Sequence, residues 1–125
     1  MNSRLQPGDG AERRDARGLA QGSVVALAPA RIARALRGRE RYKYVQPRVE
    51  REGLGWKVVS ANCSRSIDRA GGDIDIAWFV PASDGRWLLH ARDHAQGCWV
   101  LKAAGLTLAA ALARVCTDPL REFWQ

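Results

Sequence analysis

The chain has 125 residues, enough for one domain around a single hydrophobic core. Its apolar share of 46% and charged share of 26% are ordinary globular values. No run approaches the roughly 18 consecutive apolar residues that a membrane-spanning helix needs, so we expect no membrane association. The cysteines, Cys63, Cys98 and Cys116, are odd in number and widely spaced, a poor disulfide framework, which favours a cytoplasmic protein.

The formal charge of +7 is unevenly distributed along the chain. Residues 1–51 contain twelve Arg and Lys against five Asp and Glu, whereas residues 52–125 contain eight of each. An imbalance of this kind separates an electrostatic segment from a neutral folded body.

Residues 1–28 are expected to form a disordered arm. The first 22 contain Pro7 and four glycines but almost no large apolar residue. Such a segment cannot offset a backbone entropy cost of roughly 1–2 kcal/mol per residue. A start codon assigned too far upstream would give the same composition.

Residues 29–41 are predicted to form a short basic amphipathic helix that ends near Gly38. Pro29 suits a first helical turn, Ile32 and Leu36 lie four residues apart, and arginines recur every three or four positions. Two interpretations stay open: the helix contacts phosphates, or it packs Ile32 and Leu36 on the domain and leaves its arginines solvated. The first assigns nucleic-acid binding to Arg31, Arg34, Arg37, Arg39, Arg41 and Lys43.

Residues 42–125 are predicted to form an α+β domain with an antiparallel meander of about four strands. Pro47 places residues 42–49 at a sheet edge, and further strands are expected at 56–59, 73–80, 86–92 and 98–101. In the strand expected at 73–80 the side chains of Ile74, Ile76, Trp78 and Val80 should share the core face. In the strand expected at 86–92 the side chains of Trp87, Leu89 and Ala91 should lie on the same face of the sheet. The five tryptophans, Trp56, Trp78, Trp87, Trp99 and Trp124, are expected in the core.

A carboxy-terminal helix should cover this sheet. Thr107 can cap it, and Leu108, Leu112 and Val115 supply its apolar stripe. Asp118 and Pro119 then suggest the start of a short terminal helix.

Two sets of residues suggest metal chemistry. His90, His94 and Cys98 carry imidazole and thiolate groups that bind zinc, but they lack the paired spacing of a zinc motif. Asp73 and Asp75 project from one face of a strand and could share a divalent cation with help from His90. The alternative for both sets is ordinary polar side chains without a ligand, and we expect no cofactor.

The segments GRWLL at residues 85–89 and DPLREFW at residues 118–124 resemble the DUF3024 family, a small bacterial family of unknown function. The resemblance covers residues 41–125 and lacks the Lys-Trp-His segment typical of that family. The resemblance implies strands followed by a carboxy-terminal helix, as predicted above, and it implies no activity.

A second resemblance covers GWKVV at residues 55–59, Asn62 and GGDIDI at residues 71–76, which is similar to small endonuclease-like proteins with Gly-Gly-Glu-Ile-Asp before a hairpin. In that superfamily the acidic residue before the hairpin and a Glu-x-Lys segment on the next strand hold the metal and the attacking water. The resemblance implies that Asp75 corresponds to this acidic residue. Residues 90–92 read His-Ala-Arg where Glu-x-Lys belongs, which argues against catalysis.

The sequence thus favours a non-enzymatic binding or regulatory module that contacts nucleic acid through the basic arm. One alternative is a divergent metal-dependent nuclease or hydrolase that uses Asp73, Asp75 and His90. Another is a homo-oligomer that pairs through the edge strand at residues 42–49.

Overall fold

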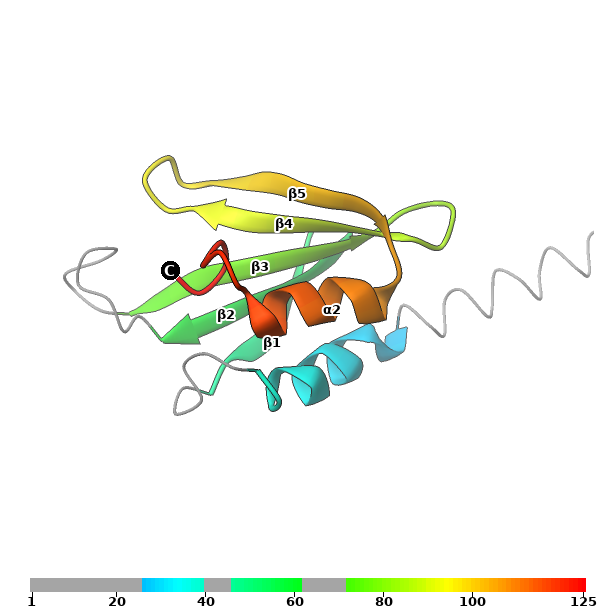
Figure 1. The fold of residues 1–125 in the computed structure, drawn as a ribbon, viewed down its shortest axis with the longest axis horizontal. Helices are drawn as coiled ribbons and strands as arrows, with labels where there is room; N and C mark the ends of the chain where they lie inside the picture. Colours follow the sequence, from blue (N-terminus) through cyan, green and yellow to red (C-terminus); the bar gives the residue numbers. More distant parts are fainter. Residues whose placement is uncertain (1–25, 40–45, 62–71) are drawn as a thin grey trace, which may run out of the picture.

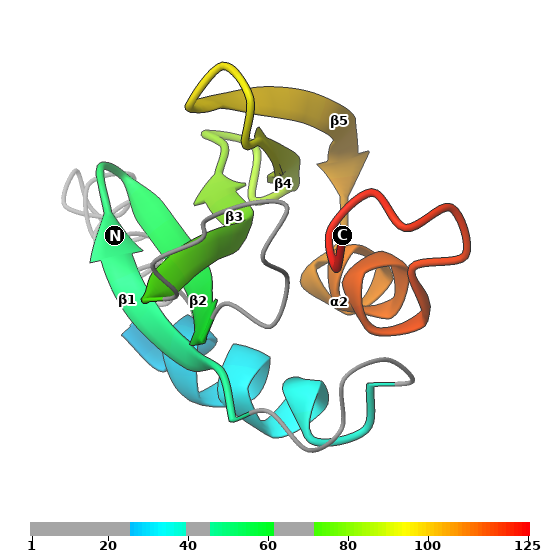
Figure 2. The same cartoon turned by 90° about the vertical axis from the view of Figure 1, so that its left-hand side faces the viewer.

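The computed structural model describes residues 26–39, 46–61 and 72–125. Five strands form one antiparallel sheet in chain order: β1 (Arg48–Glu52), β2 (Gly55–Ala61), β3 (Asp73–Pro81), β4 (Trp87–Asp93) and β5 (Cys98–Leu106). Helix α2 (Leu108–Thr117) follows the sheet, and an amino-terminal helix covers residues 26–36 of the described chain. Both helices lie on one face of the sheet, which curls around them (Figures 1 and 2). The α+β class is confirmed.

The meander has five strands rather than about four. The first strand is Arg48–Glu52 and not residues 42–49, of which residues 42–45 lie outside the described part. The amino-terminal helix already includes residue 26, ahead of Pro29, and ends at residue 36. Ala28 on this helix is fully buried and belongs to the hydrophobic core. No helix in the described segments is long and apolar enough to cross a membrane.

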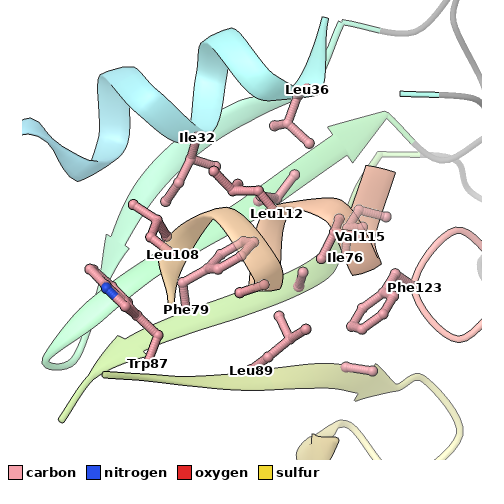
Figure 3. Packing of buried hydrophobic residues seen from close by; sticks show 14 of the residues in the cluster. Ile32, Leu36, Ile76, Phe79, Trp87, Leu89, Leu108, Leu112, Val115 and Phe123 are labelled. Carbon is pink, nitrogen blue, oxygen red and sulfur yellow. The ribbon is translucent and has the colours of Figure 1, made fainter. Parts of the chain in front are cut away.

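The core lies between the sheet and the two helices. Ile32 and Leu36 from the amino-terminal helix meet Leu112 and Val115 from α2, and Phe79 rises from the sheet beneath them (Figure 3). Burial of each such side chain stabilises the fold by about 1.5–3 kcal/mol. The amino-terminal helix is therefore an integral layer of the domain.

A bulge in β3 changes which of its residues face the core. Val58 pairs with Ala77 but its neighbour Val59 pairs with Asp75, which leaves Ile76 as an extra residue. Ile76 and Ala77 both join the core, and Phe79 follows two residues later. Trp78 consequently points to the outer face, so its predicted place beside Ile74 and Ile76 was wrong, whereas Val80 is buried.

The expectation that all five tryptophans occupy the core was also wrong. Trp87 and Trp124 are buried, and Trp56 packs partly against the core. The Trp78 ring instead lies 5.7 Å from that of Trp99 on the outer face of the sheet, where it also contacts His90.

Helix α2 is capped at its start by a side chain and at its end by the backbone N–H of Asp118, which donates to the Arg114 carbonyl. The Thr107 hydroxyl accepts a hydrogen bond from the Ala110 N–H at 3.1 Å, as predicted for a cap. At the other end Asp118 adopts a left-handed conformation with φ 39°, and no helix follows it. The predicted terminal helix was wrong because Asp118 closes α2 instead of starting a new helix.

The Asp118 carboxylate folds the last residues back onto the core. It accepts hydrogen bonds from the backbone N–H groups of Glu122 at 2.7 Å, Phe123 at 3.2 Å and Trp124 at 2.8 Å. The Trp124 indole N–H donates to the Val115 carbonyl at 2.9 Å. This arrangement buries Phe123 and Trp124 and closes the open end of the core.

Candidate functional site

The two aspartates proposed to bind a cation lie on the outer face of the sheet, each next to basic side chains. Asp73 is 2.7 Å from the Arg48 guanidinium. Asp75 is 3.1 Å from the Lys57 ammonium and 3.7 Å from Arg92. Their negative charge is therefore balanced by neighbouring strands, which leaves little attraction for a divalent cation.

The ion pair with Asp75 keeps the Lys57 ammonium group charged. Burial alone would lower the pKa of its ammonium, yet the hydrogen bond and charge of Asp75 outweigh burial and raise the pKa. Some enzymes use a neutral lysine with a lowered pKa as a base, whereas the raised pKa of Lys57 favours its charged form. The group is a structural cross-strand ion pair.

His90 is turned toward an aromatic neighbour. Its ring lies 4.6 Å from the Trp78 ring, and its Nδ1 is 3.3 Å from the Trp78 carbonyl oxygen. The register pairs His90 with Trp78 on β3 and with Leu101 on β5. The structure thus places His90 beside the Trp78 and Trp99 rings, a contact that was not predicted from the sequence.

His94 and Cys98 flank the turn between β4 and β5. Burial and the charge of Arg92 lower the pKa of His94, which favours its neutral form. Cys98 is exposed at the first position of β5, opposite Asp93. Within the described segments no group of three or more His, Cys, Asp or Glu side chains is arranged to hold a metal ion.

The predicted phosphate-binding arginines divide into two groups. Arg31 and Arg34 are exposed on the amino-terminal helix, Arg37 is exposed directly after its last residue, and no ion pair engages the three within the described segments. Arg39 is only 4% exposed, donates to the Leu36 carbonyl at 2.7 Å and stacks over the Trp124 ring at 5.2 Å. Arg39 therefore supports the tail and offers no open guanidinium. Arg41 and Lys43 lie outside the described residues.

Charge separates the two layers of the fold. The helical layer, defined as residues 26–39 and α2, contains no Asp or Glu; its charged residues are Arg31, Arg34, Arg37, Arg39 and Arg114. The strands contain five cations and five anions: Arg48, Arg51, Lys57, Arg92 and Lys102 against Glu50, Glu52, Asp73, Asp75 and Asp93. The positive surplus of the described fold thus lies on the helical layer.

A shallow apolar groove runs along the helical layer. Its volume is about 300 Å³, and Arg31, Ala35, Ala109, Leu112, Ala113 and Cys116 line it. Three of these residues are alanines, so short side chains form much of its lining. Burial raises the pKa of the Cys116 thiol in this groove, and its Sγ donates to the Ala35 carbonyl at 3.3 Å.

A comparison with known protein families matches residues 21–125 to the Domain of unknown function DUF3024. The chain belongs to the DUF3024 family. No curated protein and no solved structure matches it.

The segment by which the sequence resembles the DUF3024 family has a structural role in this fold. Asp118 holds the chain reversal, while Phe123 and Trp124 fill the end of the core. The strand around Trp87 and Leu89 contributes buried side chains of the same core. These residues therefore contribute to the core and to the closure of the chain end in this structure.

Proposed function

We propose that this DUF3024 domain is a binding module that contacts the phosphate backbone of nucleic acid through Arg31, Arg34 and Arg37. The observation that carries the proposal is that these three arginines are exposed on, or directly after, a helix anchored in the core, and that no ion pair engages them within the described segments. Arginine forks match phosphate geometry and are more weakly hydrated than lysine ammonium groups.

The spacing of the three arginines suits a phosphate backbone. They recur at three-residue intervals, so Arg34 lies about 4.5 Å further along the helix axis than Arg31, and Arg37 follows in the turn directly after the helix. Ile32 and Leu36 fix the opposite side of the helix in the core. A rigid row loses less entropy on binding than a flexible arm would, which supports the helix as the contact surface.

The contrast with the sheet supports the same choice. Arg48, Lys57 and Arg92 already have carboxylate partners at 2.7–3.7 Å. Binding a phosphate there would first require breaking these pairs. On the helical layer Arg114 has such a partner, Glu122, at 3.8 Å, whereas within the described segments no ion pair engages Arg31, Arg34 or Arg37.

A salt titration of binding to generic duplex DNA, made with the full chain, tests the proposal. Each phosphate contact contributes about 0.9 to the slope of log K against log salt concentration. The double variant Arg31→Gln/Arg34→Gln should therefore reduce the magnitude of that slope by about 1.8. Glutamine keeps good helix propensity, so the helix itself should persist.

The matched control is Arg51→Gln/Arg86→Gln, which removes the same charge from two exposed residues outside the helical layer. Its slope should stay close to that of the unaltered chain. Equal losses in both double variants would mean a diffuse charge effect and would refute the assigned surface. Failure of the full chain to bind DNA or RNA at low salt would refute nucleic-acid binding altogether.

A further inference from the structure

The two edges of the sheet differ sharply in charge. In β1 four of the five residues are charged, in the order Arg-Val-Glu-Arg-Glu. In β5 only Lys102 is charged among nine residues. Proteins commonly protect exposed edges with charged side chains, because an unpaired strand is a template for further pairing. The edge predicted from sequence to pair, near β1, is thus the protected edge, and β5 is the open one.

The first half of β5 has regular strand geometry. Residues Cys98–Leu101 pair one-to-one with the end of β4, whereas both register shifts occur beyond Leu101. Bulges twist an edge away from further pairing, so they protect the second half of the strand. The regular half lacks both bulges and charges.

Apolar side chains project from both faces of this regular half. Leu101 is 54% exposed, and Val100 is 38% exposed. The one charge of the strand, on Lys102, lies 3.7 Å from Glu122 of the same chain, so it is not left without a counter-charge. No described segment lies beyond β5 (Figures 1 and 2).

We propose that Cys98–Leu101 pairs antiparallel with the same segment of a second copy of this chain, which joins two sheets across a two-fold axis. An edge that pairs with itself gives a closed dimer in which the exposed side chains of Val100 and Leu101, which lie on opposite faces of β5, are each covered by side chains of the second copy. Pairing of β5 with β1 of another copy would instead set a neutral apolar strand against Glu50 and Glu52 and would continue as an open array. The identical strand is the better match.

The dimer should be weak and reversible. A contact formed by one short strand pair buries less than the roughly 1,200 Å² typical of stable complexes. Sedimentation velocity on the full chain, from about 5 to 500 μM, covers the range expected for such small interfaces. A reductant must be present throughout, because Cys98 is exposed and could form a covalent dimer.

Leu101→Lys places a charge on the open edge at an exposed position, so it should preserve the fold and raise the dimer dissociation constant at least about tenfold. The matched control is Leu54→Lys, the same change at a 75% exposed leucine between β1 and β2, which should leave the dimer intact. Amide exchange should show concentration-dependent protection at residues 98–101.

A chain that stays monomeric throughout the concentration range overturns the proposal. Equal loss of the dimer in Leu54→Lys and Leu101→Lys overturns it as well, since the contact would then involve the β1 edge. Growth into species larger than dimers indicates head-to-tail pairing and counts against the two-fold arrangement.

Discussion

The carboxylate of Asp118 carries a large share of the stability of this fold. Its side chain is 1% exposed and accepts the N–H groups of Glu122, Phe123 and Trp124. Asp118→Ala would leave the buried N–H groups of Phe123 and Trp124 without this acceptor, at about 1–3 kcal/mol each. Release of the tail would instead expose Phe123 and Trp124, at a similar total cost of about 3–6 kcal/mol.

Both routes give an expected loss of about 3–5 kcal/mol in the free energy of unfolding, out of the 5–15 kcal/mol typical of a domain. The midpoint of thermal unfolding should fall by about 10–20 °C. Urea unfolding followed by far-ultraviolet circular dichroism and tryptophan fluorescence measures the loss directly.

The control for this prediction is Asp84→Ala, which removes an exposed carboxylate that accepts one backbone N–H, from Arg86 at 2.9 Å. Asp118→Asn is a graded test, since asparagine tolerates the left-handed conformation and keeps one acceptor oxygen. A loss of less than about 1 kcal/mol in Asp118→Ala, or one no larger than that of Asp84→Ala, would show that the tail is not held as described.

Three further predictions concern single groups. Gly55→Ala should destabilise the fold by at least about 3 kcal/mol, measured by urea unfolding, because the new Cβ would lie 2.0 Å from the Phe79 carbonyl oxygen. Iodoacetamide should alkylate exposed Cys98 faster than Cys116, whose thiol pKa is raised by burial, and peptide mass spectrometry distinguishes the sites. Burial and Arg92 lower the pKa of His94 in the folded protein; its contribution to stability should be complete above about pH 6.5 and lost as pH falls through the folded pKa.

Each of these predictions has an internal comparison. Gly85→Ala adds a Cβ into open space at φ 80°, so it should cost only the strain of that backbone conformation, about 1 kcal/mol. Equal losses in Gly55→Ala and Gly85→Ala would contradict the clash. His94→Gln should flatten the dependence of stability on pH below about pH 6.5, and an unchanged slope would contradict the role of His94. Faster alkylation of Cys116 than of Cys98 would show that the groove opens in solution.

Local patterns predicted the features that depend on residues close together in the sequence. The alternation around Trp87, Leu89 and Ala91 placed all three on the core face, where each is at most 4% exposed. The cap at Thr107 and the apolar stripe of α2 were correct for the same reason, since both depend on residues three or four positions apart. Such short-range relations are visible in one sequence.

The errors arise where pairing between distant segments decides the outcome. Nothing in the sequence of β3 shows that Val58 and Val59 pair with residues two positions apart, and that bulge sends Trp78 to the outer face. The spacing of Asp73 and Asp75 likewise reveals nothing of Lys57, which neutralises Asp75 from the neighbouring strand. Asp118 followed by proline resembles a helix start, but its carboxylate accepts N–H groups four to six residues ahead rather than the two or three of a helix cap.

Fold and proposed function depend on different residues in this domain, and that difference can be measured. Substitutions at Asp118 should reduce nucleic-acid binding only in proportion to the loss of folded protein, because no step of the phosphate contact involves the tail. Substitutions at Arg31 and Arg34 should weaken binding and its salt dependence while the free energy of unfolding changes by less than about 0.5 kcal/mol, as usual for exposed positions. A helix that stabilises the core through Ile32 and Leu36 and binds phosphate through its opposite side can satisfy both conditions, since the two functions use separate faces of the same rigid element.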